Sequence, residues 1–149
     1  LSSLLHTRAS EGKETHLPVQ GTSMAPLLRP GCTVVVRHDV RRVRFGDVVL
    51  RWAPAEDATA HRTLLVHRVV RVGRDEDGLW FITKGDRWPR FDPPARLDDL
   101  VGKVVAVEDS QGMIELGRWP WPLLGRLLAL RSLAGGILRA RVGRWRCRS

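Results

Sequence analysis

The chain has 149 residues and a mass of 16.8 kDa, which is enough for one compact domain. Its 43% hydrophobic content excludes wholesale disorder, its two cysteines cannot form a disulfide scaffold, and no Cys/His cluster has zinc-binding spacing. The net charge of +9 is unevenly placed, because residues 1–115 carry 17 basic and 16 acidic side chains whereas residues 116–149 carry eight arginines and no acid. A basic tail on a nearly neutral body indicates attraction to phosphate, on lipid or on nucleic acid.

Residues 1–16 are predicted to be an N-terminal extension. The first residue is Leu1, and the segment carries charged side chains in place of the continuous apolar stretch of a signal peptide. No apolar run in the chain reaches the roughly 18 to 20 residues that a membrane-spanning helix needs. We therefore expect this N-terminus neither to anchor nor to export the chain.

Residues 17–116 are predicted to form a mainly β domain with a compact antiparallel sheet, because short β-type runs alternate with turn residues. The expected strands are residues 17–19, 33–37, 48–52, 64–72, 79–84, 103–108 and 113–116. Asp77-Gly78 is the strongest hairpin signal among the turns. Residues 53–62 and 86–99 are expected to be loops, the second of them rich in proline.

Residues 117–149 are predicted to contain a C-terminal helix and a basic tail. The sequence LLGRLLALRSLAGGILRARV is helix-prone, although its arginines do not keep to one side of a helical wheel. A membrane span is disfavoured, since its central arginines cost more in a bilayer than its leucines gain. Two alternatives remain level: a helix lying on anionic lipid, with Trp119, Trp121 and Trp145 at the interface, and a helix packed against the β domain.

The segment QGTSMAP places Ser23 just after a predicted strand and a glycine, where a short turn begins. Such a position exposes the hydroxyl and leaves backbone N–H groups unpaired beside it, and these groups can stabilise the oxyanion of acyl transfer. Capping of the turn is the alternative role for this serine.

His67 is the only one of the five histidines inside a predicted strand, on the same face as Leu65 and Val69. A partly apolar face favours the neutral imidazole that a general base requires, but a core histidine bonded to backbone is the favoured interpretation from this residue alone. Asp86 and Asp92 follow in the segment TKGDRWPRFDP. An acid near the histidine would fix its tautomer, and the alternative is a turn with two solvated acids.

Together these segments resemble the signal-peptidase clan of serine proteases. GTSMAP is similar to the nucleophile box, LRPGCTVVVR and FGDVVLRW to the two boxes after it, VHRVVRV to the base box, FITKGD to the acid box and LVGKVVAVE to the closing strand. The resemblance covers residues 17–108. A histidine in the base box is typical of the branch that includes the archaeal and endoplasmic-reticulum signal peptidases, whereas other members have a lysine there.

The resemblance implies a signal-peptidase-like serine endopeptidase that cleaves a precursor, signal or leader peptide. The roles it implies are Ser23 as nucleophile, His67 as general base, Asp92 as orienting acid and Asp86 as an adjacent supporting acid. Which of the two acids contacts the histidine stays open, and the Ser23 amide would supply one oxyanion donor. Cys32 stands where the family usually has an aspartate, and we expect it to be a small buried filler.

The resemblance also implies an extended peptide substrate paired to a strand edge, with Met24 and Leu27 lining its side-chain pockets. No cofactor and no metal are expected. The partners would be the peptide or precursor-protein substrate and, through the C-terminal segment, an anionic membrane surface. A location at the membrane or in the cytoplasm fits this interpretation, and nucleic acid is the less favoured partner.

Two alternatives to this function remain. The first is a non-catalytic β module that binds nucleic acid or an anionic membrane through its basic tail. The second, less favoured, is a self-cleaving regulator of the repressor type. Such regulators use a lysine base, which Lys84 would have to supply here.

Overall fold

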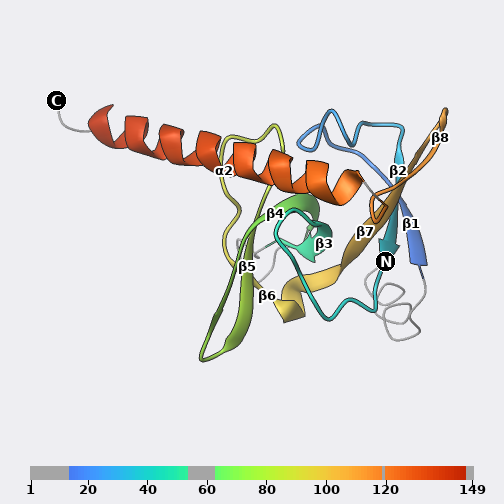
Figure 1. The fold of residues 1–149 in the computed structure, drawn as a ribbon, viewed down its shortest axis with the longest axis horizontal. Helices are drawn as coiled ribbons and strands as arrows, with labels where there is room; N and C mark the ends of the chain where they lie inside the picture. The colour runs from blue at the N-terminus through green and yellow to red at the C-terminus, as the bar shows by residue number, and fades with distance from the viewer. Residues whose placement is uncertain (1–13, 54–62, 119, 147–149) are drawn as a thin grey trace.

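A computed structural model of the protein describes residues 14–53, 63–118 and 120–146, with side chains of the C-terminal helix described as far as residue 134. A curled antiparallel sheet is crossed by one long helix, and the C-terminal end of that helix extends beyond the sheet (Figure 1). The mainly β class and the C-terminal helix predicted from the sequence are confirmed. Within these residues, no helix has the length and apolar character needed to cross a membrane.

Among the described residues the sheet has eight strands, and every pairing between them is antiparallel. The strands are β1 (Glu14–Pro18), β2 (Thr33–Arg37), β3 (Val48–Trp52), β4 (Leu64–Asp75), β5 (Gly78–Lys84), β6 (Ala95–Arg96), β7 (Leu100–Asp109) and β8 (Gly112–Glu115). Their order in the sheet is β1-β2-β7-β3-β4-β5-β6, and β8 pairs with β7. On one edge β7 pairs first with β3 and then with β8, and this change of partner lets the sheet curl.

Several strand boundaries differ from the prediction; β7, for example, begins at Leu100, three residues earlier than expected. β1 begins at Glu14, so the end of the predicted N-terminal extension belongs to the sheet. β4 and β5 continue to their Asp77-Gly78 turn, where Gly78 has the positive φ of 108° that such a hairpin demands. Within the predicted loop 86–99, β6 and a short 3-10 helix (Leu97–Asp99) form, because the backbone after the prolines pairs with β5. The other predicted loop lies outside the described residues except at its first residue, Ala53.

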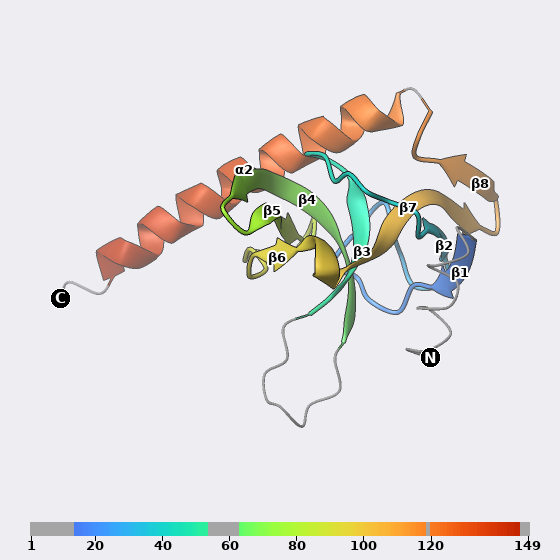
Figure 2. The same cartoon turned by 90° about the horizontal axis from the view of Figure 1, so that it is seen from below.

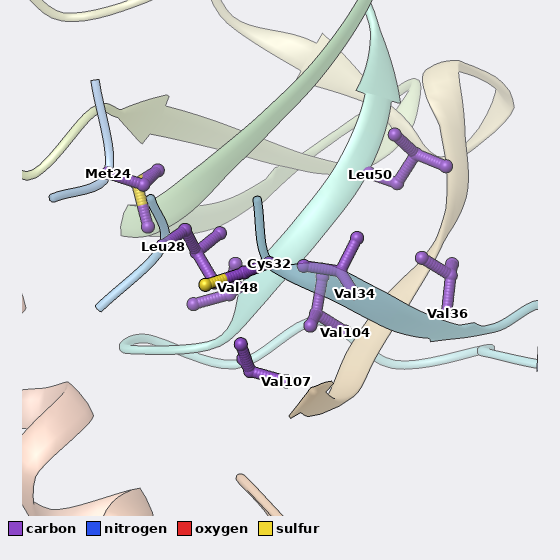
Figure 3. Packing of buried hydrophobic residues seen from close by; sticks show 9 residues of the cluster. All are labelled: Met24, Leu28, Cys32, Val34, Val36, Val48, Leu50, Val104 and Val107. Atoms are coloured by element: carbon purple, nitrogen blue, oxygen red, sulfur yellow. The ribbon is translucent and has the colours of Figure 1, made fainter. Parts of the chain in front are cut away.

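The larger hydrophobic core lies between β2, β3, β7 and the turn that follows β1. Figure 3 shows its nine buried side chains, which are Met24, Leu28, Cys32, Val34, Val36, Val48, Leu50, Val104 and Val107. Cys32 is buried among them with a free thiol, as expected for a small filler. A second cluster on the other side of β3 contains Val49, Val69 and Phe81. Because alternate residues of β3 feed the two clusters, the strand is buried on both faces.

Helix α2 (Trp121–Arg146) packs its small residues against β4 and the loop before β3. Gly125, Ala129 and Ser132 are buried, and a Cβ atom at Gly125 would lie 3.0 Å from the carbonyl oxygen of Gly46. Leu123, Leu127 and Leu130 in the same turns are exposed, and Figure 2 shows the helix lying along one side of the sheet. Packing against the β domain, one of the two alternatives for this segment, therefore holds for the first half of the helix.

We expect Gly125→Val to lower the free energy of unfolding by about 1–3 kcal/mol, because the added methyl groups have no room against the Gly46 backbone. Ala134→Val is the matched control on the exposed side of the same helix, and we expect a change below about 1 kcal/mol there. Urea denaturation measures both values. Equal destabilisation by the two substitutions would contradict this packing.

Candidate active site

Ser23 lies in the turn between β1 and β2, and its neighbours anchor that turn in the core. The turn is closed by hydrogen bonds from Ala25 N–H to Thr22 O, 3.1 Å, and from Leu28 N–H to Met24 O, 3.0 Å. The Met24 and Leu28 side chains are 2% and 1% exposed, whereas Ser23 is only half-buried. The core therefore holds the turn from below and leaves the serine hydroxyl at the surface of a groove.

Ser23, His67 and Asp92 form a chain of hydrogen bonds. The distance from Ser23 Oγ to His67 Nε2 is 3.0 Å, and that from His67 Nδ1 to Asp92 Oδ2 is 2.6 Å. Since an ionised carboxylate can only accept, Nδ1 carries the proton and Nε2 accepts the proton of the serine hydroxyl. The structure thus brings together three residues that lie far apart in the sequence.

A second buried histidine shows the purely structural arrangement by contrast. His38 places Nδ1 2.9 Å from Val101 O and Nε2 2.8 Å from Thr15 Oγ1. From the sequence around His67 alone, the favoured interpretation was a core histidine bonded to the backbone. In the structure it is His38 that makes such a bond. The ring of His67 instead joins a serine hydroxyl to a carboxylate, which is the arrangement of a general base and its orienting acid.

Backbone pairing and a threonine hydroxyl fix the positions of the imidazole and the carboxylate. His67 is opposite Val49 in the β3–β4 register. Asp92 N–H donates to Thr83 O at 2.9 Å, and Thr83 Oγ1 donates to Asp92 Oδ2 at 2.6 Å. Thr83 is fully buried at the end of β5. The sequence reasoning missed it, although it is the one hydroxyl-bearing residue of β5 and is followed by the Lys-Gly-Asp turn.

Arg51 extends this network beneath the site and was also missed. Its Nη1 donates to Pro93 O at 2.9 Å and to Thr83 Oγ1 at 3.4 Å, so it supports the loop that carries Asp92. The residue is 1% exposed, and burial lowers the pKa of its guanidinium, an effect that the carboxylates of Asp92 and Asp99 partly offset. A charged residue in the middle of the apolar strand VVLRW was the signal that could have revealed it.

Asp86 is not bonded to His67 but to Arg68, the next residue of β4. Both contacts of this two-pronged pair are 2.8 Å, and Arg68 Nη1 also donates to Gly46 O at 3.0 Å. The two side chains are 2% and 8% exposed. Of the two acids left open by the sequence, Asp92 is therefore the one that contacts the histidine, and Asp86 ties the turn after β5 to the loop before β3.

The turn after β5 also lies directly against the backbone of Ser23. A Cβ atom at Gly85 would lie 2.9 Å from Ser23 O and 3.0 Å from Ser23 Cβ, so only glycine fits there. Arg87 N–H donates to the same carbonyl oxygen at 2.8 Å. Lys84, the residue before this turn, directs its ammonium to Ser132 Oγ of α2 at 2.7 Å. The self-cleaving alternative would need Lys84 as the base for a serine, and in this structure Lys84 contacts Ser132 of the helix.

A groove of ≈ 540 Å³ opens beside Ser23 and His67. One wall is the segment 17–21 and the other is the first part of β4, residues 64–67. Its apolar lining includes Met24, one of the two residues predicted to bind substrate, together with Leu28, Val34 and Leu50. Leu27, the other predicted substrate-binding residue, lines a separate cavity of ≈ 180 Å³ between the turn and α2.

No family model, curated protein or solved structure matches this chain. Within the described residues, no three His, Cys, Asp or Glu side chains come together in a way that could hold a metal ion. What the site can do therefore follows from its own geometry, which is a serine hydroxyl bonded to a buried imidazole with a carboxylate behind it.

We expect Asp86→Ala to lower the free energy of unfolding by about 3–5 kcal/mol, because it leaves the buried Arg68 guanidinium without its counter-ion. The matched control is Asp77→Ala. The Asp77 side chain is 85% exposed and forms a surface ion pair with Arg96. There we expect a change of no more than about 1 kcal/mol. Urea denaturation distinguishes the two. A small effect of Asp86→Ala would contradict the structural role of this acid.

Proposed function

We propose that this protein is a serine endopeptidase whose catalytic residues are Ser23, His67 and Asp92. The observation that carries the proposal is the unbroken hydrogen-bond chain from the serine hydroxyl through the imidazole to the carboxylate. The resemblance of the surrounding segments to the signal-peptidase clan supports the same chemistry. Asp86 is assigned a structural role through Arg68 in place of the supporting role that the resemblance implied.

In the proposed mechanism, His67 Nε2 takes the proton of the Ser23 hydroxyl as Oγ attacks the carbonyl carbon of the scissile peptide bond. The resulting imidazolium is stabilised by Asp92, which already accepts a hydrogen bond from Nδ1. His67 then gives the proton to the leaving amine, and an acyl-enzyme forms on Ser23. Water attacks this ester with the same base assistance and releases the acid product.

Backbone N–H groups of the Ser23 turn are the proposed oxyanion donors. Within the described residues, the Ser23 amide donates no backbone hydrogen bond, so it is free to bind the oxygen of a tetrahedral intermediate. The turn is held rigid by buried Met24 and Leu28 below it and by Gly85 beside it. A rigid donor is what electrostatic stabilisation requires, because little reorganisation is then needed during the reaction.

The proposed substrate is an extended peptide that occupies the groove between residues 17–21 and 64–67. Both walls are segments of extended chain or strand, so a peptide between them can pair with backbone groups on either side. The apolar floor favours apolar side chains near the scissile bond and disfavours charged ones. A precursor with a signal or leader peptide offers such a segment.

We expect Ser23→Ala and His67→Ala each to lower kcat/KM for peptide cleavage by at least about 10⁴-fold, because each removes an indispensable partner of the same proton transfer. Asp92→Asn should cost about 10²–10⁴-fold, since an amide no longer fixes the correct tautomer of the ring. The measurement is cleavage of a library of extended peptides, followed by mass spectrometry.

The control is His38→Gln, which changes a second buried histidine without touching the site. We expect this variant to keep cleaving the peptides that the parent cleaves, provided that circular dichroism shows it folded. Cleavage that survives Ser23→Ala would overturn the proposal.

A further inference from the structure

Helix α2 has an unusual distribution of side chains: three small residues are buried against the sheet, and three leucines on the opposite face are exposed. Leu123, Leu127 and Leu130 are 52%, 54% and 53% exposed. Their spacing of four and three residues places them in one stripe along the helix. The buried Gly125, Ala129 and Ser132 lie on the opposite face. A solvated helix on a globular protein normally shows the reverse pattern, with its apolar face inwards.

Positive charge flanks the leucine stripe. Arg126 and Arg131 are exposed and make no ion pair within the described part of the chain. The chain from residue 116 onward contains eight arginines and no acidic residue. The outer face of α2 therefore combines exposed leucines with uncompensated positive charge.

We propose that this face, defined by Leu123, Leu127, Leu130, Arg126 and Arg131, docks on the surface of an anionic lipid bilayer. The leucines enter the boundary between headgroups and acyl chains, and the arginines stay at the lipid phosphates. The helix lies in the plane of the surface, in keeping with its small inner face being already occupied by β4 and the loop before β3.

An anionic lipid surface complements both the leucines and the arginines of this face. A second copy of the chain or a nucleic acid would complement only one of the two. A second copy of the chain could cover the leucines, but it would bring arginine-rich, acid-free helices together with like charges opposed. A nucleic acid could neutralise the arginines, but its phosphate backbone offers nothing apolar to cover three exposed leucines. An anionic bilayer supplies negative headgroups and an apolar layer beneath them.

The test is co-sedimentation of the full chain with vesicles of phosphatidylcholine alone and of equal parts phosphatidylcholine and phosphatidylglycerol. We expect binding to the anionic vesicles and little to the neutral ones. Leu127→Ser with Leu130→Ser keeps the charge and should weaken binding by at least about tenfold. Arg126→Gln with Arg131→Gln keeps the leucines, and it should weaken binding by about fivefold per arginine.

The matched control is Val72→Ser with Met113→Ser, which removes two exposed apolar side chains from strands and should leave vesicle binding unchanged. Because all substituted side chains are exposed, thermal unfolding should show every variant folded. The proposal is overturned by absent binding to anionic vesicles or by binding that the leucine variant keeps in full. Two further results would overturn it, each in a protein that does not bind vesicles. The first is self-association that the leucine variant loses, and the second is DNA binding that the leucine variant keeps.

Discussion

One chain of hydrogen bonds connects the groove to the interior of the sheet, and the candidate site depends on it. It begins at the Ser23 hydroxyl, passes through the His67 ring to Asp92, and continues through Thr83 to the guanidinium of Arg51. Asp92 accepts hydrogen bonds from both the His67 ring and the Thr83 hydroxyl, so the tautomer of the imidazole and the position of its carboxylate follow from the bonds beneath them. Loss of Thr83 or Arg51 would leave the serine, the histidine and the aspartate in place but would no longer hold the carboxylate in position.

The buried cations around this chain favour specificity over stability. Among the described side chains, Arg51, Arg68 and Lys84 are all at most 5% exposed, and no buried side-chain nitrogen or oxygen lacks a hydrogen-bond partner. Burying a charge with its partner is often no more stabilising than an apolar pair would be. Any conformation that separates such a pair is, however, strongly disfavoured, because it leaves a buried charge without its partner. Asp86 with Arg68 and Lys84 with Ser132 therefore hold the turn after β5 in the one position that places Gly85 against Ser23.

The sequence was sufficient for most of the fold, because β-type runs and their turns are local signals. β2 and β3 lie where they were predicted, but the two-residue β6 could not be found, since it exists only through pairing with β5. The choice between Asp86 and Asp92 was beyond the sequence for a similar reason. Both acids follow the same strand within a few residues, and the choice depends on Arg68, whose side chain alternates to the other face of β4 from His67.

The orientation of α2 was equally beyond prediction. Leucines in a helix next to a β domain predict an inward apolar face, whereas the close approach of Gly125 to Gly46 admits only small residues there. The same contact that decides this orientation brings Ser132 to Lys84, so the helix belongs to the framework of the site as well as to the surface of the protein.

The most direct measurement of the central claim is the identity of the residue that a serine-directed fluorophosphonate reagent modifies. Mass spectrometry of the digested adduct should place one phosphonyl group on Ser23, because among the serines of the described residues only Ser23 has its hydroxyl bonded to a histidine ring. The His67→Gln variant should remain folded and unlabelled. A parent protein that stays unlabelled, or one labelled at another serine with Ser23 untouched, would contradict the account.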